Sequence, residues 1–249
     1  MLAMMAQGGF AARGDGGTGR RGDWGTDHAL ARELWKTGNA DARVLATMIA
    51  DPAQATEQEL DGWMGEVRYY LLADLLAGFV FRTPFAWKKM REWRGSSEDF
   101  EGQAGWNLLA RLAINGPDTE DAFFEKQVAV IERRIHKAKN WTRHAMNLVL
   151  IAIGLRGPGL QKLALAAAGR IGKVEVDHGE TGCVTPDAAA YIWRAAGRKR
   201  KRKNPRGGRP GQIPSGYTPR LVRGQSMRQR PAGSGVQKSR LAGVTRAWW

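Results

Sequence analysis

The chain of 249 residues contains one cysteine and carries a net charge of +15. A single cysteine excludes an internal disulfide, which favours a reducing, cytoplasmic location, at the nucleoid if the source is bacterial. No apolar run reaches the ~18 residues that a membrane-spanning helix requires, so no membrane partner is expected. The charge is uneven: residues 198–249 contain 15 of the 39 basic residues and no acidic one, and residues 1–197 are neutral overall. The basic excess therefore gives no information about the folded part of the chain.

Residues 1–26 are rich in Gly and lack apolar periodicity, which predicts a disordered extension. Beyond them, apolar residues recur at helical spacing between breaks of Gly, Pro and Asp. Three of these segments follow residues suited to cap a helix, namely Asp27, Thr56 and Asn140, and Glu59 completes a capping box with Thr56. We expect helices at residues 28–38, 39–51, 56–67, 68–80, 85–94, 98–114, 119–137, 141–155, 159–173 and 187–196, with an extended segment only at 173–187.

The expected helices pair across short turns, and no β-hairpin pattern is present, so the prediction is an all-α protein. Pairs recur at about 35–40 residues, which is the period of HEAT-type repeats. A compact helical bundle fits the same rhythm, and the rhythm leaves the two architectures about even. The predicted organisation is a helical domain at residues 27–196 between a disordered extension (1–26) and a disordered basic tail (197–249).

One carboxylate, Asp74, stands inside the apolar run YYLLADLLAGFVF. Burying an ionised carboxylate is costly unless a partner or a function requires it. Asp74 is therefore a candidate catalytic residue, and the alternative is that it caps a neighbouring helix or pairs with an arginine. Both interpretations stay open on the sequence alone.

Basic residues concentrate in two segments of the helical domain. Side chains three or four positions apart share a helix face, so several can meet one phosphate backbone, although a solvated face is the common alternative. Trp141, inside the first segment, can stack on a ligand or simply pack. The first segment contributes Arg133, Arg134, Lys137, Lys139 and Arg143, and the second contributes Lys88, Lys89 and Arg91.

The basic tail is predicted to contact phosphates without reading sequence, because its like charges keep it open. A localisation signal, binding of RNA or of an acidic partner, and the absence of any role are the alternatives. The candidate phosphate contacts are Arg198, Lys199, Arg200, Lys201, Arg202 and Lys203.

The segment DHGETGC gathers Asp177, His178, Glu180 and Cys183, which are residue types that bind zinc. Their spacing matches no standard structural zinc site. We therefore expect a hydrogen-bonded loop with a buried, inert Cys183, and neither a metal nor another cofactor.

Five longer motifs follow one another along the chain: HALARELWKTGNADARVLATMIADP (28–52), ELDGWMGEV (59–67), TPFAWKKMREW (83–93), MNLVLIAIGLR (146–156) and KVEVDHGETGCVTPDAAAYI (173–192). Together they resemble the DNA alkylation repair family, the AlkD-like glycosylases built from HEAT-like repeats. The resemblance covers about residues 28–195 and implies a right-handed superhelical solenoid of helix pairs, monomeric, with duplex DNA on its concave face. Family members carry another helical repeat before residue 28, so either the solenoid is shortened here or the start is not native.

The resemblance also implies a chemistry. AlkD-like enzymes hydrolyse the N-glycosidic bond of purines made cationic by N3 or N7 alkylation, with an aspartate, two tryptophans and an arginine around the lesion. By position, the aspartate is Asp74 and the first aromatic is Tyr70, whereas Gln103 stands near the expected arginine and Leu148 near the second tryptophan, with Trp141 earlier on that helix. Two hypotheses follow: an alkylpurine DNA glycosylase with Asp74 and Tyr70 as catalytic residues, or a catalytically silent HEAT-like module that binds DNA or another partner.

Overall fold

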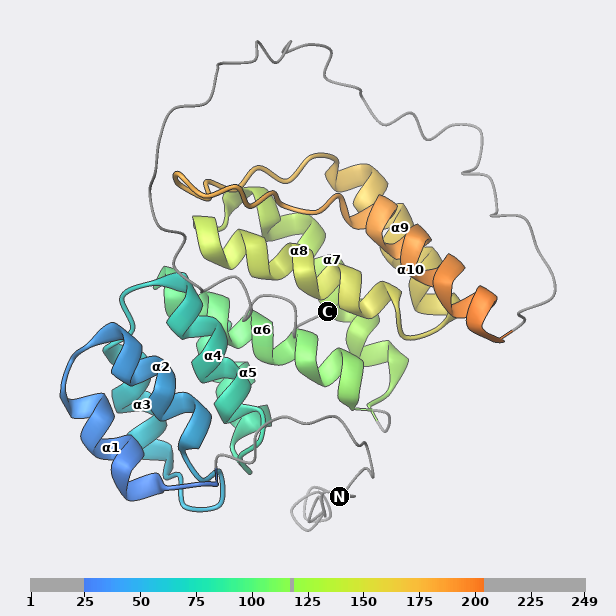
Figure 1. The fold of residues 1–249 in the computed structure, drawn as a ribbon. Helices are drawn as coiled ribbons and strands as arrows, with labels where there is room; N and C mark the ends of the chain where they lie inside the picture. The colour runs from blue at the N-terminus through green and yellow to red at the C-terminus, as the bar shows by residue number, and fades with distance from the viewer. Residues whose placement is uncertain (1–24, 117–118, 204–249) are drawn as a thin grey trace, which may run out of the picture. The chain divides into compact units, whose positions relative to one another are not determined.

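The computed structural model describes residues 25–116 and 119–203, with the side chains of 198–203 outside the description. The described residues form ten α-helices and one 3-10 turn and contain no strand, which confirms the all-α prediction (Figure 1). None of the helices in these ranges is long and apolar enough to cross a membrane. Most of the predicted extension and tail lies outside the described ranges. The elements are α1 (His28–Lys36), α2 (Ala40–Ile49), α3 (Glu57–Gly65), α4 (Tyr70–Val80), α5 (Ala86–Trp93), α6 (Asp99–Asn115), α7 (Asp121–Arg134), η1 (Ile135–Lys137), α8 (Asn140–Gly154), α9 (Pro158–Ile171) and α10 (Ala188–Lys203).

The helices form two layers. In the even layer, α2, α4, α6, α8 and α10 each contact the next member in chain order. The other helices pack against this layer: α1 on α2, α3 on α4, α5 on α6, and α7 and α9 on α8 (Figure 1). Each even-numbered helix therefore has an odd-numbered partner on one side and its even-numbered neighbours on the other, as expected for an array of helix pairs.

Local signals account for several helix starts. The Asp27 side chain accepts from the Leu30 N–H, and Thr56 Oγ1 accepts from the Glu59 N–H, so Asp27 and Thr56 are confirmed as caps. The Glu59 carboxylate does not complete the expected capping box, because it lies 3.1 Å from His28 Nε2 and accepts from Arg32 Nε at 2.7 Å. The prediction for Asn140 was wrong, because Asn140 is the first residue of α8 rather than its cap.

Two glycines of α6 allow close packing beside the candidate site. A Cβ atom at Gly105 would lie 2.1 Å from the backbone nitrogen of Arg94, at the end of α5. A Cβ atom at Gly102 would lie 2.6 Å from Thr142 Oγ1, in the first turn of α8. Real Cβ atoms do not approach other atoms this closely, so these glycines let α6 lie directly against α5 and α8.

The segment between α9 and α10, residues 172–187, has no regular secondary structure and runs along α8 (Figure 1). The Asn140 side chain bonds both backbone groups of Asp177, at 2.8 Å each, and the Asn147 Nδ2 donates to the Pro186 carbonyl at 2.9 Å. These bonds hold the segment against the even layer. The following helix, α10, continues through Lys203, seven residues past its expected end at residue 196.

Candidate functional site

Asp74 lies part-buried on α4 and is held by two amide side chains of α6. Gln103 Nε2 donates to Asp74 Oδ1 at 2.6 Å, and Asn107 Nδ2 donates to the same oxygen. Gln103 is only 1% exposed, and its Nε2 also donates to the Tyr70 carbonyl at 3.0 Å. The amide that stands near the expected arginine therefore contacts the carboxylate directly and fixes its orientation.

The environment of Asp74 shifts its protonation. Burial raises the pKa of the Asp74 carboxyl to about 6, and the hydrogen bond from Gln103, the positive charge of Arg111 and the hydrogen bond from Asn107 oppose this rise. The pKa of Arg111 is lowered, because the effect of burial outweighs the opposing effect of the Asp74 charge. The carboxylate is thus mostly ionised at neutral pH and lies in the field of a buried guanidinium.

The sequence reasoning missed Asn107 and Arg111. They follow Gln103 on α6 at intervals of four residues, so the three polar side chains form one stripe between the apolar residues of that helix. That stripe is the signal that could have identified them.

An aromatic pair adjoins the carboxylate. Tyr70, four residues before Asp74 on α4, stacks on Trp141 of α8 with ring centroids 4.2 Å apart and planes 13° apart. No aromatic residue stands at the Leu148 position, so Trp141 supplies the second ring of the site from the first turn of α8.

Asp99 of α6 fixes this turn of α8. Its Oδ2 accepts from the Trp141 N–H at 3.0 Å, and its Oδ1 accepts from the Thr142 N–H at 2.8 Å. A carboxylate suits this place, because it meets free N–H groups and the positive end of the helix dipole. A residue of the neighbouring helix thus caps α8, in the place predicted for Asn140.

Two histidines extend the aromatic pair. His144 and His178 meet edge to face with ring centroids 5.2 Å apart, and each also lies edge-on to Trp141. Burial and, to a smaller extent, the charge of His178 together lower the pKa of His144 to about 4, so His144 is neutral at physiological pH. His178 Nε2 lies 2.9 Å from Thr185 Oγ1, within the segment anchored to α8.

No group of three His, Cys, Asp or Glu residues in the described ranges is arranged to hold a metal ion. Cys183 is exposed, so the prediction that it is buried was wrong. The physical reason is that the segment is anchored near Glu175, Asp177 and Pro186, while residues 179–184 between the anchors face solvent.

Lys89, in the second basic segment, was predicted to contact a phosphate, but the structure shows it buried among carboxylates. Its side chain is 1% exposed, and its Nζ lies 2.8–3.1 Å from carboxylates of Glu57, Asp61 and Glu92. Lys88 pairs with Glu57 at 2.5 Å, whereas Arg91 is exposed. Carboxylates, two of them from α3, therefore neutralise both lysines of this segment.

In the first basic segment, Arg143 binds main-chain carbonyls of the protein, whereas the other four cations are exposed to solvent. The Arg143 guanidinium donates to the carbonyls of Glu175, Ala138 and His136, which ties the 172–187 segment to the start of α8. The other four cations of the segment are exposed and form no ion pair with any residue that the structure describes. They are Arg133, Arg134, Lys137 and Lys139. For the tail candidates Arg198, Lys199, Arg200, Lys201, Arg202 and Lys203, the backbone belongs to α10 and the side chains lie outside the described part.

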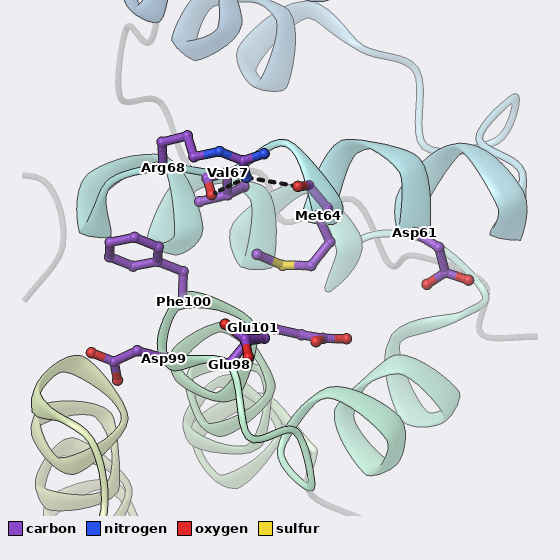
Figure 2. Close-up of a pocket in the computed structure, with 9 residues that line it drawn as sticks. Asp61, Met64, Val67, Arg68, Glu98, Asp99, Phe100 and Glu101 are labelled. Atoms are coloured by element: carbon purple, nitrogen blue, oxygen red, sulfur yellow. Dashed lines mark hydrogen bonds between the residues drawn. The ribbon is translucent and has the colours of Figure 1, made fainter.

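A pocket of about 280 Å³ lies between α3 and the start of α6 (Figure 2). Figure 2 shows Glu98, Asp99 and Glu101 below Met64 and Arg68. The Arg68 guanidinium donates to the carbonyls of Gly65 and Val67. Acidic side chains therefore dominate this pocket, and their charge disfavours a DNA backbone at this place.

Comparisons with known proteins agree with this architecture. Residues 20–192 match the model of the family described as DNA alkylation repair enzyme. The chain is 29% identical over 177 residues to the uncharacterized protein Lin0241 of Listeria innocua, which covers 69% of this chain and 75% of that protein. It is 28% identical over 174 residues to the uncharacterized protein Lmo0209 of Listeria monocytogenes, with the same coverage of each chain.

A solved structure shows the same fold. It is described as a new family of proteins related to the HEAT-like repeat DNA glycosylases with affinity for branched DNA structures. The TM-score is 0.64 at 26% identity, covering 70% of this chain and 76% of that chain. The expected HEAT-like all-α fold and the expected family are both confirmed. The chain belongs to the DNA alkylation repair enzyme family.

Proposed function

We propose that this protein binds duplex DNA along its even layer and hydrolyses the N-glycosidic bond of cationic N3- or N7-alkylated purines. The observation that carries the proposal is the pairing of an oriented carboxylate, Asp74, with the stacked rings of Tyr70 and Trp141. A base that is already cationic leaves without a general acid. The main requirement is then a negative charge beside the oxocarbenium-like sugar, as in glycoside hydrolysis.

The geometry at Asp74 supports this role. Both amides donate to Oδ1, so neither of them engages Oδ2. The pKa of about 6 leaves the carboxylate anionic at neutral pH, and its partial burial strengthens its attraction for a positive charge. Tyr70 and Trp141 cover each other's inner faces, so an outward face of the stacked pair is what can meet a cationic base or sugar. Arg111 provides the guanidinium charge that the expected position near Gln103 lacks.

A base-release assay tests the proposal. The substrate is duplex DNA with one N7-methylguanine, and the proteins are wild type, Asp74→Asn and the control Asp41→Asn, which changes an exposed carboxylate of α2. Asn can still accept both amide hydrogen bonds, so the fold is retained. We expect wild type and Asp41→Asn to release base above the spontaneous rate and Asp74→Asn to fall to that rate. Equal release by wild type and Asp74→Asn would falsify the proposal.

The second candidate function is recognition of DNA without cleavage. It is favoured by Gln103 near the expected arginine, by Leu148 near the expected tryptophan, and by the affinity for branched DNA described for the similar structure. The test is to compare binding of a four-way junction and of a linear duplex of equal length. Tighter binding to the junction, together with background base release by wild type, would establish this second function in place of the first.

A further inference from the structure

A depression of about 370 Å³ is lined on one side by Thr142 and Met146 of α8. Its walls come from the end of α5, the α5–α6 turn, the end of α7, η1 and the start of α8. Four of its ten lining residues are cations, and none is acidic. The lining consists of Arg94, Ser96, Ser97, Trp106, Arg134, Lys137, Ala138, Lys139, Thr142 and Met146.

The positive charge in this depression is not neutralised within the described part of the chain. Arg134, Lys137 and Lys139 form no ion pair there, and the Arg94 guanidinium donates to the neutral amide oxygen of Gln127. Arg94 also lies over the Trp106 ring, 5.7 Å from its centroid. Burial lowers the pKa of Arg94, and the charges of Arg134 and Arg91 lower it further. Like charges thus crowd together, and a bound anion would relieve their repulsion.

The backbone holds these cations together. Arg134 ends α7, Lys137 ends η1 and Lys139 precedes α8, so one chain reversal brings three cations to the same wall. Gly105 allows α6 to touch the backbone of Arg94, which fixes the opposite wall. The charges therefore converge on one place instead of spreading along a solvated helix face.

We infer that this depression binds a phosphate of the DNA backbone, and that it is the main backbone contact of the helical domain outside the Asp74 site. Arginine and lysine side chains at one place suit the oxygens of a phosphodiester, through forked and single hydrogen bonds. Thr142 lines the depression, and Trp141, its neighbour in the chain, stacks on Tyr70, so the depression and the proposed lesion site share the first turn of α8. The inference rests on the proposed function only in taking DNA as the ligand.

The test compares two double variants of the full-length protein. Lys137→Gln/Lys139→Gln removes two charges of the depression, and Lys126→Gln/Lys162→Gln removes two exposed charges elsewhere on α7 and α9. Fluorescence anisotropy with an unmodified labelled duplex gives the dissociation constant at a series of KCl concentrations. The basic C-terminal residues are present in every protein, so their contribution cancels in the comparison.

We expect the slope of log affinity against log salt to fall by about 1 for each lost phosphate contact, hence by about 2 in the first variant. The control variant should keep the wild-type slope. Equal slopes and affinities for the two variants would overturn the inference. A change in binding of inorganic phosphate without any change in DNA affinity would also overturn it, because the site would then take a free anion.

A second measurement separates this inference from the proposed function. At saturating protein, single-turnover base release should be lost in Asp74→Asn, whose substitution lies outside the depression. Asp74→Asn should in turn keep the wild-type salt slope. A reduced slope in the depression variant with no base release by wild type would support the phosphate site and reject the glycosylase. Base release by wild type together with a wild-type salt slope in the depression variant would support the glycosylase and reject the phosphate site.

Discussion

Tyr70 of α4 and Trp141 of α8 stack almost parallel, 71 positions apart in the sequence, with their ring centroids separated by 4.2 Å. This contact joins two helices of the even layer that are separated by α6. Tyr70 stands four residues before Asp74 on α4, and the Asp74 carboxylate is bound from α6. Three successive even-numbered helices therefore contribute to one site.

Replacing Trp141 should affect stability and base release together. We expect Trp141→Leu to lower the free energy of unfolding by about 2 kcal/mol, since a stacked, part-buried ring is lost. Trp87→Leu is the matched control, because Trp87 makes an edge contact with Phe123 away from Asp74. Urea unfolding and base release are measured for both. Loss of base release in both variants, or in neither, would contradict a role of Trp141 at the site.

The rate of base release should rise with pH through the pKa of Asp74. Only the ionised carboxylate stabilises a positive sugar, and its pKa is about 6. We expect the single-turnover rate to be low near pH 5 and to level off above about pH 7. A rate that is flat across this range, measured on DNA saturated with protein and corrected for spontaneous release, would argue against Asp74 as the reacting carboxylate.

The stability difference between wild type and Asp74→Asn should depend on pH. The folded-state pKa of Asp74 lies above its ordinary value, so the folded protein binds this proton more tightly than the unfolded chain. Wild type should therefore gain stability relative to Asp74→Asn as pH falls from above 6 towards 4, by up to roughly 3 kcal/mol. Urea unfolding at both ends of this range measures the change. The opposite sign would mean that the carboxylate is stabilised, not penalised, by its surroundings.

Asp99 should govern the position of Trp141. Asp99→Ala removes the cap of α8 and is expected to cost about 1–2 kcal/mol and to reduce base release. Asp99→Asn keeps one of the two accepting oxygens, so it should lose less stability and less base release than Asp99→Ala. If the two variants behave alike, the hydrogen bonds to Trp141 and Thr142 are not what the site requires.

Lys89 should matter for folding and not for DNA. Lys89→Met leaves three carboxylates without their common cation, and because these are partly exposed we expect a loss of about 1–3 kcal/mol. Lys88→Met, at an exposed position with one close partner, should cost much less. DNA affinity, measured well below the unfolding temperature, should be the same in both variants. A selective loss of DNA affinity in Lys89→Met would reinstate it as a phosphate contact.

The features that could be predicted from sequence are those set by nearby residues. Apolar spacing and the caps at Asp27 and Thr56 located the helices, and the interval of four residues placed Tyr70 and Asp74 on one face of α4. The amides that hold Asp74 lie 29 and 33 residues away, so only the packing of α6 on α4 brings them together. Lys89 was misjudged for the same reason, because Asp61 and Glu57 precede it by 28 and 32 residues.

The anchoring of residues 172–187 to α8 has a consequence for variation. Asn140, Arg143 and Asn147 hold this segment entirely through its main-chain atoms, at Asp177, Glu175 and Pro186. Main-chain groups are the same in almost every residue, so side chains of the segment can be exchanged without detaching it. His178, which faces Trp141 and His144, can thus be replaced while its carrier stays in place. Substitution of His178 should therefore change the surroundings of Trp141 while the segment stays anchored to α8.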